Sequence, residues 1–109
     1  MTAVLFLLQR ASAAFLALAV VVHLATIHYA VRGGLTAGEI LARTHGNPEY
    51  LAFYSLFAVA VAVHAPIGLR NVLREWLGWQ GRSCDGALVL FSFGLLVVGF
   101  TAVTALYFA

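Results

Sequence analysis

Charged residues are scarce in this chain, and lysine is absent altogether. Only 9% of the 109 residues are charged, whereas 63% are hydrophobic. Because soluble domains carry about 25% charged residues, the composition excludes an ordinary soluble domain and indicates that lipid is the solvent. At this length we expect a single transmembrane domain, residues 1–109.

The remaining charges and the single cysteine exclude further classes of protein. Six arginines against four acidic residues give a net charge of +2, and the arginines are scattered rather than grouped in a basic run. Nucleic acid is therefore not an expected partner. The single cysteine, Cys84, excludes an internal disulfide and a metal cluster built from cysteines of this chain.

Acidic residues are missing from the middle of every apolar stretch. All four lie in the predicted connections or at the ends of apolar stretches, whereas a transporter usually needs carboxylates near the midplane or broken helices. A small transporter protomer is therefore a disfavoured alternative. The sequence also lacks a carboxylate pair, a nucleophile–base pair and a phosphate-binding loop, so we expect no catalysis by this chain alone.

Three apolar stretches are each long enough to cross the hydrocarbon core, which needs about 20 residues. The pairs Gly33-Gly34 and Asn47-Pro48 separate the first two stretches. No basic residue precedes the first apolar stretch, and Arg10 interrupts it, so we expect this segment to remain in the mature protein rather than act as a signal peptide. The sequence predicts an all-α integral membrane protein with three transmembrane helices, at about residues 11–31, 50–73 and 87–108.

Arginine placement predicts the orientation, because positive residues favour the inside of a membrane. Four arginines fall on the side of the N-terminus and the second connection, and two on the other side: Arg10, Arg70, Arg74 and Arg82 against Arg32 and Arg43. We therefore expect the N-terminus inside. Gly94 and Gly99 in the third span predict close helix packing. Since three helices make a thin bundle, we also expect a second membrane chain that completes a larger bundle.

His64 is the main candidate ligand, in the stretch "AVAVHAPIGLRNVLREW" (residues 60–76). Ala60 and Gly68 lie one turn to either side of it, and Pro66 should kink the helix and widen the gap they leave. A porphyrin edge needs such a gap, and histidine is a common axial ligand of haem iron. The alternative is a histidine hydrogen-bonded to a neighbouring helix. We favour haem, because an ionisable residue inside a membrane usually has a function.

His23 repeats this pattern on the first span, with the small neighbours Ala19 and Thr26. At 1.5 Å per residue, His23 and His64 should lie roughly 12 Å apart in depth. They cannot share one iron, because metal–nitrogen bonds are about 2 Å long. Each histidine would need a partner from another chain. The arrangement predicts either two haems, or one haem and one histidine that binds no cofactor.

Other polar residues lie near the ends of the spans. His28 lies about 140° around the helix from His23, so we expect it to form interfacial hydrogen bonds, with a role as a spare ligand as the alternative. Arg10 and Ser12 lie at the inner end of the first span and are candidates for a binding site. The alternative for Arg10 is that its side chain extends to the lipid headgroups. Arg70 either reaches haem propionates or marks the inner interface.

Two stretches carry a resemblance to a known family. "LLQRASAAF", followed by a mid-helix histidine and then by "HAPIGLRNVLREW", resembles the membrane anchor (cytochrome b) subunits of succinate dehydrogenases and fumarate reductases, respiratory complex II. In that family the first helix commonly begins with arginine-x-serine, here Arg10 and Ser12. The second carries a haem histidine followed by a glycine and an arginine, here His64, Gly68 and Arg70.

The resemblance implies cofactors and partners. His64 would bind haem b opposite a histidine of a second anchor subunit, and His23 would bind another haem, so that two haems are favoured over one. The soluble partners would be an iron–sulfur subunit docked on the inner face and a flavoprotein subunit that handles succinate and fumarate. Quinone would bind near the inner surface, with Arg10 and Ser12 as hydrogen-bond donors. The implied location is the cytoplasmic (inner) membrane of a prokaryote.

Three departures from the family pattern affect the quinone site more than the haem. Gln9 stands where a histidine often precedes the arginine, Phe6 stands where a serine is often found, and Glu75 replaces an aspartate. The alternative within the same family is a haem-free membrane scaffold, which only recruits the soluble subunits.

Overall fold

Helices account for nearly the whole chain in a computed structural model, which describes residues 3–109. In chain order they are α1 (Ala3–Gly33), α2 (Ala37–Thr44), α3 (Pro48–Val72), the π-helical turn η1 (Leu73–Leu77) and α4 (Arg82–Tyr107). No β-strand occurs in this range, which confirms the all-α prediction.

Three of the described helices are long and apolar enough to cross a membrane, as predicted. They are α1, α3 together with η1 (Pro48–Leu77), and α4. Only 11% to 17% of their most apolar windows is buried within the chain. Most of their apolar side chains therefore face outward, where lipid or another membrane helix can cover them.

All three helices begin before the predicted spans, most clearly α1. It begins at Ala3 rather than near residue 11, because residues 3–8 are themselves apolar. Arg10 does not end the helix, because arginine is a good helix former. Its guanidinium carbon lies 5.4 Å from the centroid of the Phe6 ring, one turn earlier. This cation–π contact holds the exposed arginine along the helix surface.

The connection between α1 and α3 contains the short helix α2, which was not predicted from the sequence. Thr36 caps α2: its hydroxyl accepts a hydrogen bond from the Glu39 amide at 3.2 Å and donates to the Glu39 carboxylate at 2.7 Å. Asn47 caps α3 by accepting from two amides of its first turn, at 3.0 and 3.3 Å. The two breaker pairs thus end α1 and begin α3 as predicted.

The connection between α3 and α4 is shorter than expected, since only residues 78–81 are not helical. Gly78, with a φ of 67°, ends η1 in the left-handed conformation that glycine adopts readily. Gly81, with a φ of 99°, precedes the first turn of α4. The indole N–H of Trp79 donates to the Ser83 hydroxyl at 3.0 Å and ties the turn to α4.

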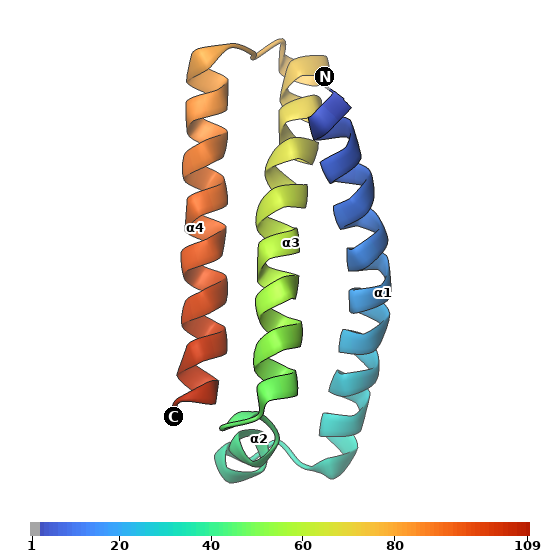
Figure 1. Cartoon of the computed structure of the whole chain (residues 1–109), viewed down its shortest axis with the longest axis vertical. Coiled ribbons are helices and arrows are strands. Elements are labelled where there is room, and N and C mark those ends of the chain that lie inside the picture. The colour runs from blue at the N-terminus through green and yellow to red at the C-terminus, as the bar shows by residue number, and fades with distance from the viewer. Residues whose placement is uncertain (1–2) are drawn as a thin grey trace.

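The three long helices lie side by side in one layer, with α3 in the middle (Figure 1). Helix α3 packs against α1 on one side and α4 on the other. The N-terminus and the α3–α4 connection lie at one end of the layer, here called the N-terminal end. Helix α2 and the C-terminus lie at the other, here called the α2 end.

Close packing of α3 and α4 depends on Gly99. A Cβ atom at this position would lie 2.8 Å from the Cβ of Ala58 on α3, so any larger residue would push the helices apart. The prediction of close packing is confirmed for Gly99. It is wrong for Gly94 within this chain, because a Cβ there would meet nothing within 4 Å.

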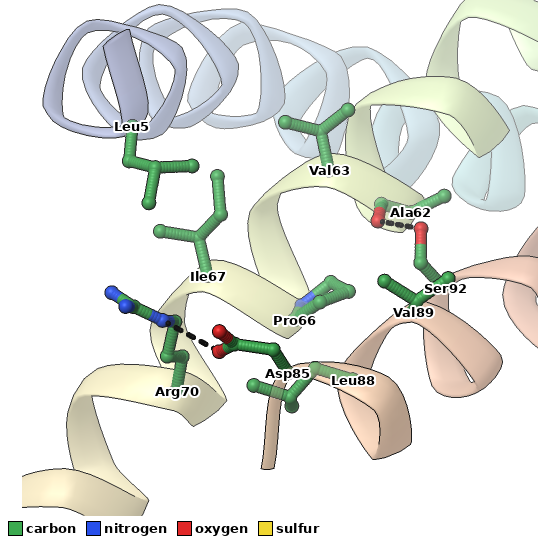
Figure 2. A pocket seen from close by; sticks show the side chains of 10 residues that line it. All are labelled: Leu5, Ala62, Val63, Pro66, Ile67, Arg70, Asp85, Leu88, Val89 and Ser92. Carbon is green, nitrogen blue, oxygen red and sulfur yellow. Dashed lines mark hydrogen bonds and ion pairs between the residues drawn. The ribbon is translucent and has the colours of Figure 1, made fainter. Parts of the chain in front are cut away.

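Pro66 lies inside α3 and leaves a backbone group unpaired, but α3 continues through it to Val72. Without an N–H at Pro66, the carbonyl of Ala62 has no partner within the helix. The Ser92 hydroxyl of α4 donates to this carbonyl at 2.7 Å (Figure 2). Since an unsatisfied carbonyl costs several kcal/mol in lipid, Ser92 both satisfies the proline site and ties α4 to α3.

Candidate functional site

His64 faces α1 and forms a polar contact there. Its Nδ1 lies 3.3 Å from the hydroxyl oxygen of Ser12, which is buried in the α1–α3 interface. The same hydroxyl donates a hydrogen bond to the Gln9 carbonyl, one turn earlier on α1, at 3.1 Å. The three residues form a short chain of hydrogen bonds that joins the two helices.

This chain of hydrogen bonds is compatible with one tautomer of the imidazole in particular. A serine hydroxyl has one hydrogen; when Ser12 gives it to the Gln9 carbonyl, as the contact at 3.1 Å allows, its oxygen can only accept from His64. Nδ1 of His64 then carries the hydrogen, and Nε2 keeps the lone pair. Histidines that bind metals have this arrangement, because a hydrogen bond from the other ring nitrogen fixes the tautomer.

His64 also lines a groove between α1 and α3, with a volume of about 480 Å³. It is the only polar residue among the described residues that line this groove. The others are Ala13, Leu16, Ala17, Val20, Phe57 and Val61. Two alanines make the α1 wall of the groove shallow, and the imidazole of His64 lines an otherwise apolar groove. These residues fit the edge of an apolar macrocycle such as haem.

Gly68 lies one turn beyond His64. The space left by its missing side chain is filled by Gln9 of α1 and not left open for a ligand. A Cβ at Gly68 would lie 3.3 Å from Nε2 of Gln9. The other amide atom of Gln9, Oε1, is buried and has no hydrogen-bond partner among residues 3–109. The gap at Gly68 is thus occupied by Gln9, whereas the open groove lies beside Ala13 and Ala17.

His23 has a partner on α3 as well. Its Nδ1 lies 2.9 Å from the Tyr54 hydroxyl, and its ring packs edge-on against Tyr54 and Phe57, with centroid distances of 5.6 Å in both cases. Like His64, it is half-buried in the α1–α3 interface. Both histidines therefore direct Nδ1 at a hydroxyl of the neighbouring helix.

The two histidines lie far apart along the layer. His23 is eleven residues beyond Ser12 on α1, and its partner Tyr54 is ten residues before His64 on α3. At 1.5 Å per residue, both helices give a separation of roughly 15 Å. Side chains this far apart cannot bind one iron, in agreement with the sequence argument.

The structure does not bring Arg10 and Ser12 together. Two residues apart on a helix, their side chains point about 200° apart. Ser12 is buried against His64, whereas Arg10 is exposed beside Phe6. The two residues expected at a quinone site thus face different surroundings, and Ser12 holds the imidazole.

Arg70 also lies away from His64, on the side of α3 that faces α4. Its Nε donates to Oδ1 of Asp85 at 3.2 Å, an ion pair between α3 and α4. Six residues apart on a helix, Arg70 and His64 point about 120° apart. The side chain of Arg70 therefore does not point toward the place where the propionates of a haem at His64 would lie. Its partner Asp85 lies in the first turn of α4.

The remaining histidines are exposed. His28 is exposed on α1, and His45 is exposed at the C-terminal cap of α2. Within residues 3–109, no three histidine, cysteine, aspartate or glutamate side chains gather in one place. Any metal held here through His64 would take a single ligand from the described part of the chain.

Sequence reasoning missed three partners: Tyr54, Ser92 and Asp85. The antiparallel pairing of α1 and α3 could have identified Tyr54, because a residue eleven positions beyond Ser12 must meet one about ten positions before His64. Pro66 could have suggested a hydroxyl donor for the Ala62 carbonyl, although not which one. Asp85 had no signal, since its pairing with Arg70 depends on how the short connection turns.

No protein-family model, no curated protein and no solved structure matches this chain significantly. The resemblance to complex II anchors thus stays a prediction from the sequence.

Proposed function

We propose that this chain is a haem b-binding membrane anchor subunit of a succinate:quinone oxidoreductase or quinol:fumarate reductase. The observation that carries the proposal is His64 itself, which contacts the Ser12 hydroxyl through Nδ1 and lines an apolar groove between α1 and α3. His64 would hold haem b through its imidazole. The haem would supply one-electron chemistry, and this chain would connect an iron–sulfur subunit on the inner side with a quinone in the membrane.

In this proposal His23 holds a second haem nearer the outer face. Its separation from His64 of roughly 15 Å suits two haems at different depths, and its Nδ1 is oriented by Tyr54 at 2.9 Å. A second anchor subunit would supply the further histidines that hold each haem. A flavoprotein subunit completes the complex, in the cytoplasmic membrane of a prokaryote with the N-terminus inside.

The second candidate is a haem-free anchor that recruits the same soluble subunits. One observation favours it: the Nδ1 atoms of both half-buried histidines have hydroxyl partners within this chain, and His23 also packs between aromatic rings. A histidine paired in this way is stable between helices without a metal. The two candidates differ only in whether Nε2 of each ring binds iron.

The deciding experiment is a dithionite-reduced minus oxidised spectrum of the purified complex, with haem stoichiometry from the pyridine haemochrome. It compares the wild type with His64→Ala and His23→Ala, and uses the exposed His28→Ala as the matched control. We expect two haems b per complex in the wild type and in the control. Each of the other two variants should lose one haem.

Other outcomes would revise the proposal in defined ways. One haem that disappears only in His64→Ala would leave His23 as a structural residue bonded to Tyr54. An intact wild-type complex without haem would refute the ligand proposal and support the scaffold. Loss of haem in His28→Ala would mean that the Nδ1 partners do not identify the ligands.

A further inference from the structure

A second cavity lies between α3 and α4, on the side of α3 away from His64, and is covered in part by Leu5 of α1. Its volume is about 370 Å³, and it is here called the Arg70 cavity. We propose that the Arg70 cavity binds one anionic phospholipid, with an acyl chain along its apolar wall and the phosphate on Arg70. This proposal does not depend on the presence of haem.

The walls of the Arg70 cavity are apolar along most of their length. They are formed by Leu5, Ala62, Val63, Pro66, Ile67, Leu88 and Val89 (Figure 2). Of its three polar lining residues, Ser92 already uses its hydroxyl hydrogen on the Ala62 carbonyl. The other two, Arg70 and Asp85, form the ion pair at one end of the cavity. An occupant therefore has an apolar body and one polar end.

The polar end offers an unused donor. Arg70 binds Asp85 through Nε alone, and its Nη1 is buried without a hydrogen-bond partner among residues 3–109. A buried unpaired donor is costly, so an acceptor oxygen from a ligand would be stabilising. Guanidinium groups match phosphate oxygens in geometry and charge.

The charge of the N-terminal end favours a phosphate over a neutral acceptor. By their places in α1, α3, η1 and α4, four of the six arginines lie at this end together with two acids: Arg10, Arg70, Arg74 and Arg82 with Glu75 and Asp85. The arginines outnumber the acids here, and this surplus of positive charge attracts an anion. Basic pockets between transmembrane helices bind anionic headgroups for this reason.

The depth of Arg70 agrees with the headgroup level. The layer is 48 Å long, and a hydrocarbon core of about 30 Å leaves about 9 Å at each end. Arg70 lies seven residues before the end of η1, or about 10 Å along the axis. Its side chain therefore lies at the boundary of the hydrocarbon core, where a lipid phosphate lies, and the apolar wall runs from there toward the midplane.

The test is native mass spectrometry of the full chain in detergent, titrated with dioleoylphosphatidylglycerol and, separately, with the phosphatidylcholine of the same acyl chains. Arg70→Gln removes the donor, and Arg74→Gln removes the same charge one turn away, outside the cavity lining. Val89→Trp obstructs the cavity. Its control is Val98→Trp, equally exposed on α4 but absent from the lining: 69% against 68%.

We expect one phosphatidylglycerol per chain, bound more tightly than phosphatidylcholine. Arg70→Gln should weaken binding about tenfold, the typical effect of losing a charge-assisted hydrogen bond. Val89→Trp should weaken it similarly, whereas the two controls should bind as the wild type does. Because Val89→Trp keeps the Arg70–Asp85 ion pair, it tests the site even if Arg70→Gln misfolds.

Three outcomes would overturn the proposal. Equal losses in Arg70→Gln and Arg74→Gln would show diffuse attraction to the arginines instead of a site. Unchanged binding in Val89→Trp would place the lipid elsewhere. A short-chain ubiquinone that displaces phosphatidylglycerol and binds more tightly, with the same dependence on Arg70, would identify the cavity as a quinone pocket.

Discussion

Ser12 links α1 to the imidazole of His64. Its hydroxyl lies 3.3 Å from Nδ1 of His64 and donates to the Gln9 carbonyl, while the quinone role that the family resemblance implies for it stays a prediction. A residue of this kind positions a ligand and adjusts its basicity, because a hydrogen bond to the second ring nitrogen makes an imidazole a stronger electron donor. Loss of this hydrogen bond should therefore change the tautomer of His64 and the midpoint potential of any haem iron bound to it.

We predict that Ser12→Ala changes the tautomer of His64 without unfolding the protein. In the haem-free chain, the ¹⁵N chemical shifts of His64 should change from a form protonated only at Nδ1 to a mixture of both tautomers. In a haem-loaded complex, the weaker imidazole donor should raise the midpoint potential of one haem by about 20–40 mV, corresponding to a hydrogen bond worth about 0.5–1 kcal/mol.

Ser55→Ala is the matched control for Ser12→Ala, because Ser55 is a half-buried serine on α3 that does not line the His64 groove. It should leave the ¹⁵N shifts and the potential unchanged. If Ser12→Ala leaves the His64 tautomer unchanged, the contact at 3.3 Å does not determine the protonation of the ring.

At the scale of elements, composition predicted three apolar helices because lipid imposes a simple rule: each span needs a long apolar run. The capping residues were also predictable, since Asn47-Pro48 and Gly33-Gly34 determine their own backbone conformation locally. The sequence analysis missed α2 because a short amphipathic helix gives a weak signal beside long spans. It could not find Asp85 opposite Arg70, because that pair depends on the packing of α3 against α4.

The contact between Ser92 and Pro66 gives an element-scale prediction. Ser92→Ala leaves the Ala62 carbonyl without a donor, which should lower the free energy of unfolding by about 1–3 kcal/mol. Pro66→Ala restores the amide N–H that this carbonyl would accept within α3. In the double variant, removal of Ser92 should therefore cost much less than it does alone.

The single cysteine provides the measurement for this cycle. Cys84 is buried, with 1% of its surface exposed, so the temperature at which a maleimide dye modifies it reports on the separation of α4. We expect a lower midpoint for Ser92→Ala and a recovery in the double variant. Equal losses in the presence and absence of Pro66 would show that Ser92 stabilises the protein by another contact.

At the scale of the whole molecule, the asymmetry of the arginines is the main feature of the layer. Arg10, Arg70, Arg74 and Arg82 lie toward the N-terminal end, and Arg32 and Arg43 toward the α2 end. Because arginines favour the inner side, we predict that the N-terminal end is inside. A green fluorescent protein inserted at Gln80 should fluoresce, and alkaline phosphatase fused after Ala109 should be active.

A charge variant tests whether the arginines cause this orientation. Replacing Arg74 and Arg82 by glutamine leaves two arginines at each end, so the positive-inside preference disappears. The C-terminal phosphatase should then lose about half of its activity per molecule, as chains insert in both orientations. Replacing Glu39 and Glu49 by glutamine is the control, because acidic residues contribute little to the rule.

Full phosphatase activity in the arginine variant would mean that the contacts of the fold, or a partner chain, determine the orientation. An inactive phosphatase in the wild type would reverse the proposed orientation and place the Arg70 cavity at the outer surface.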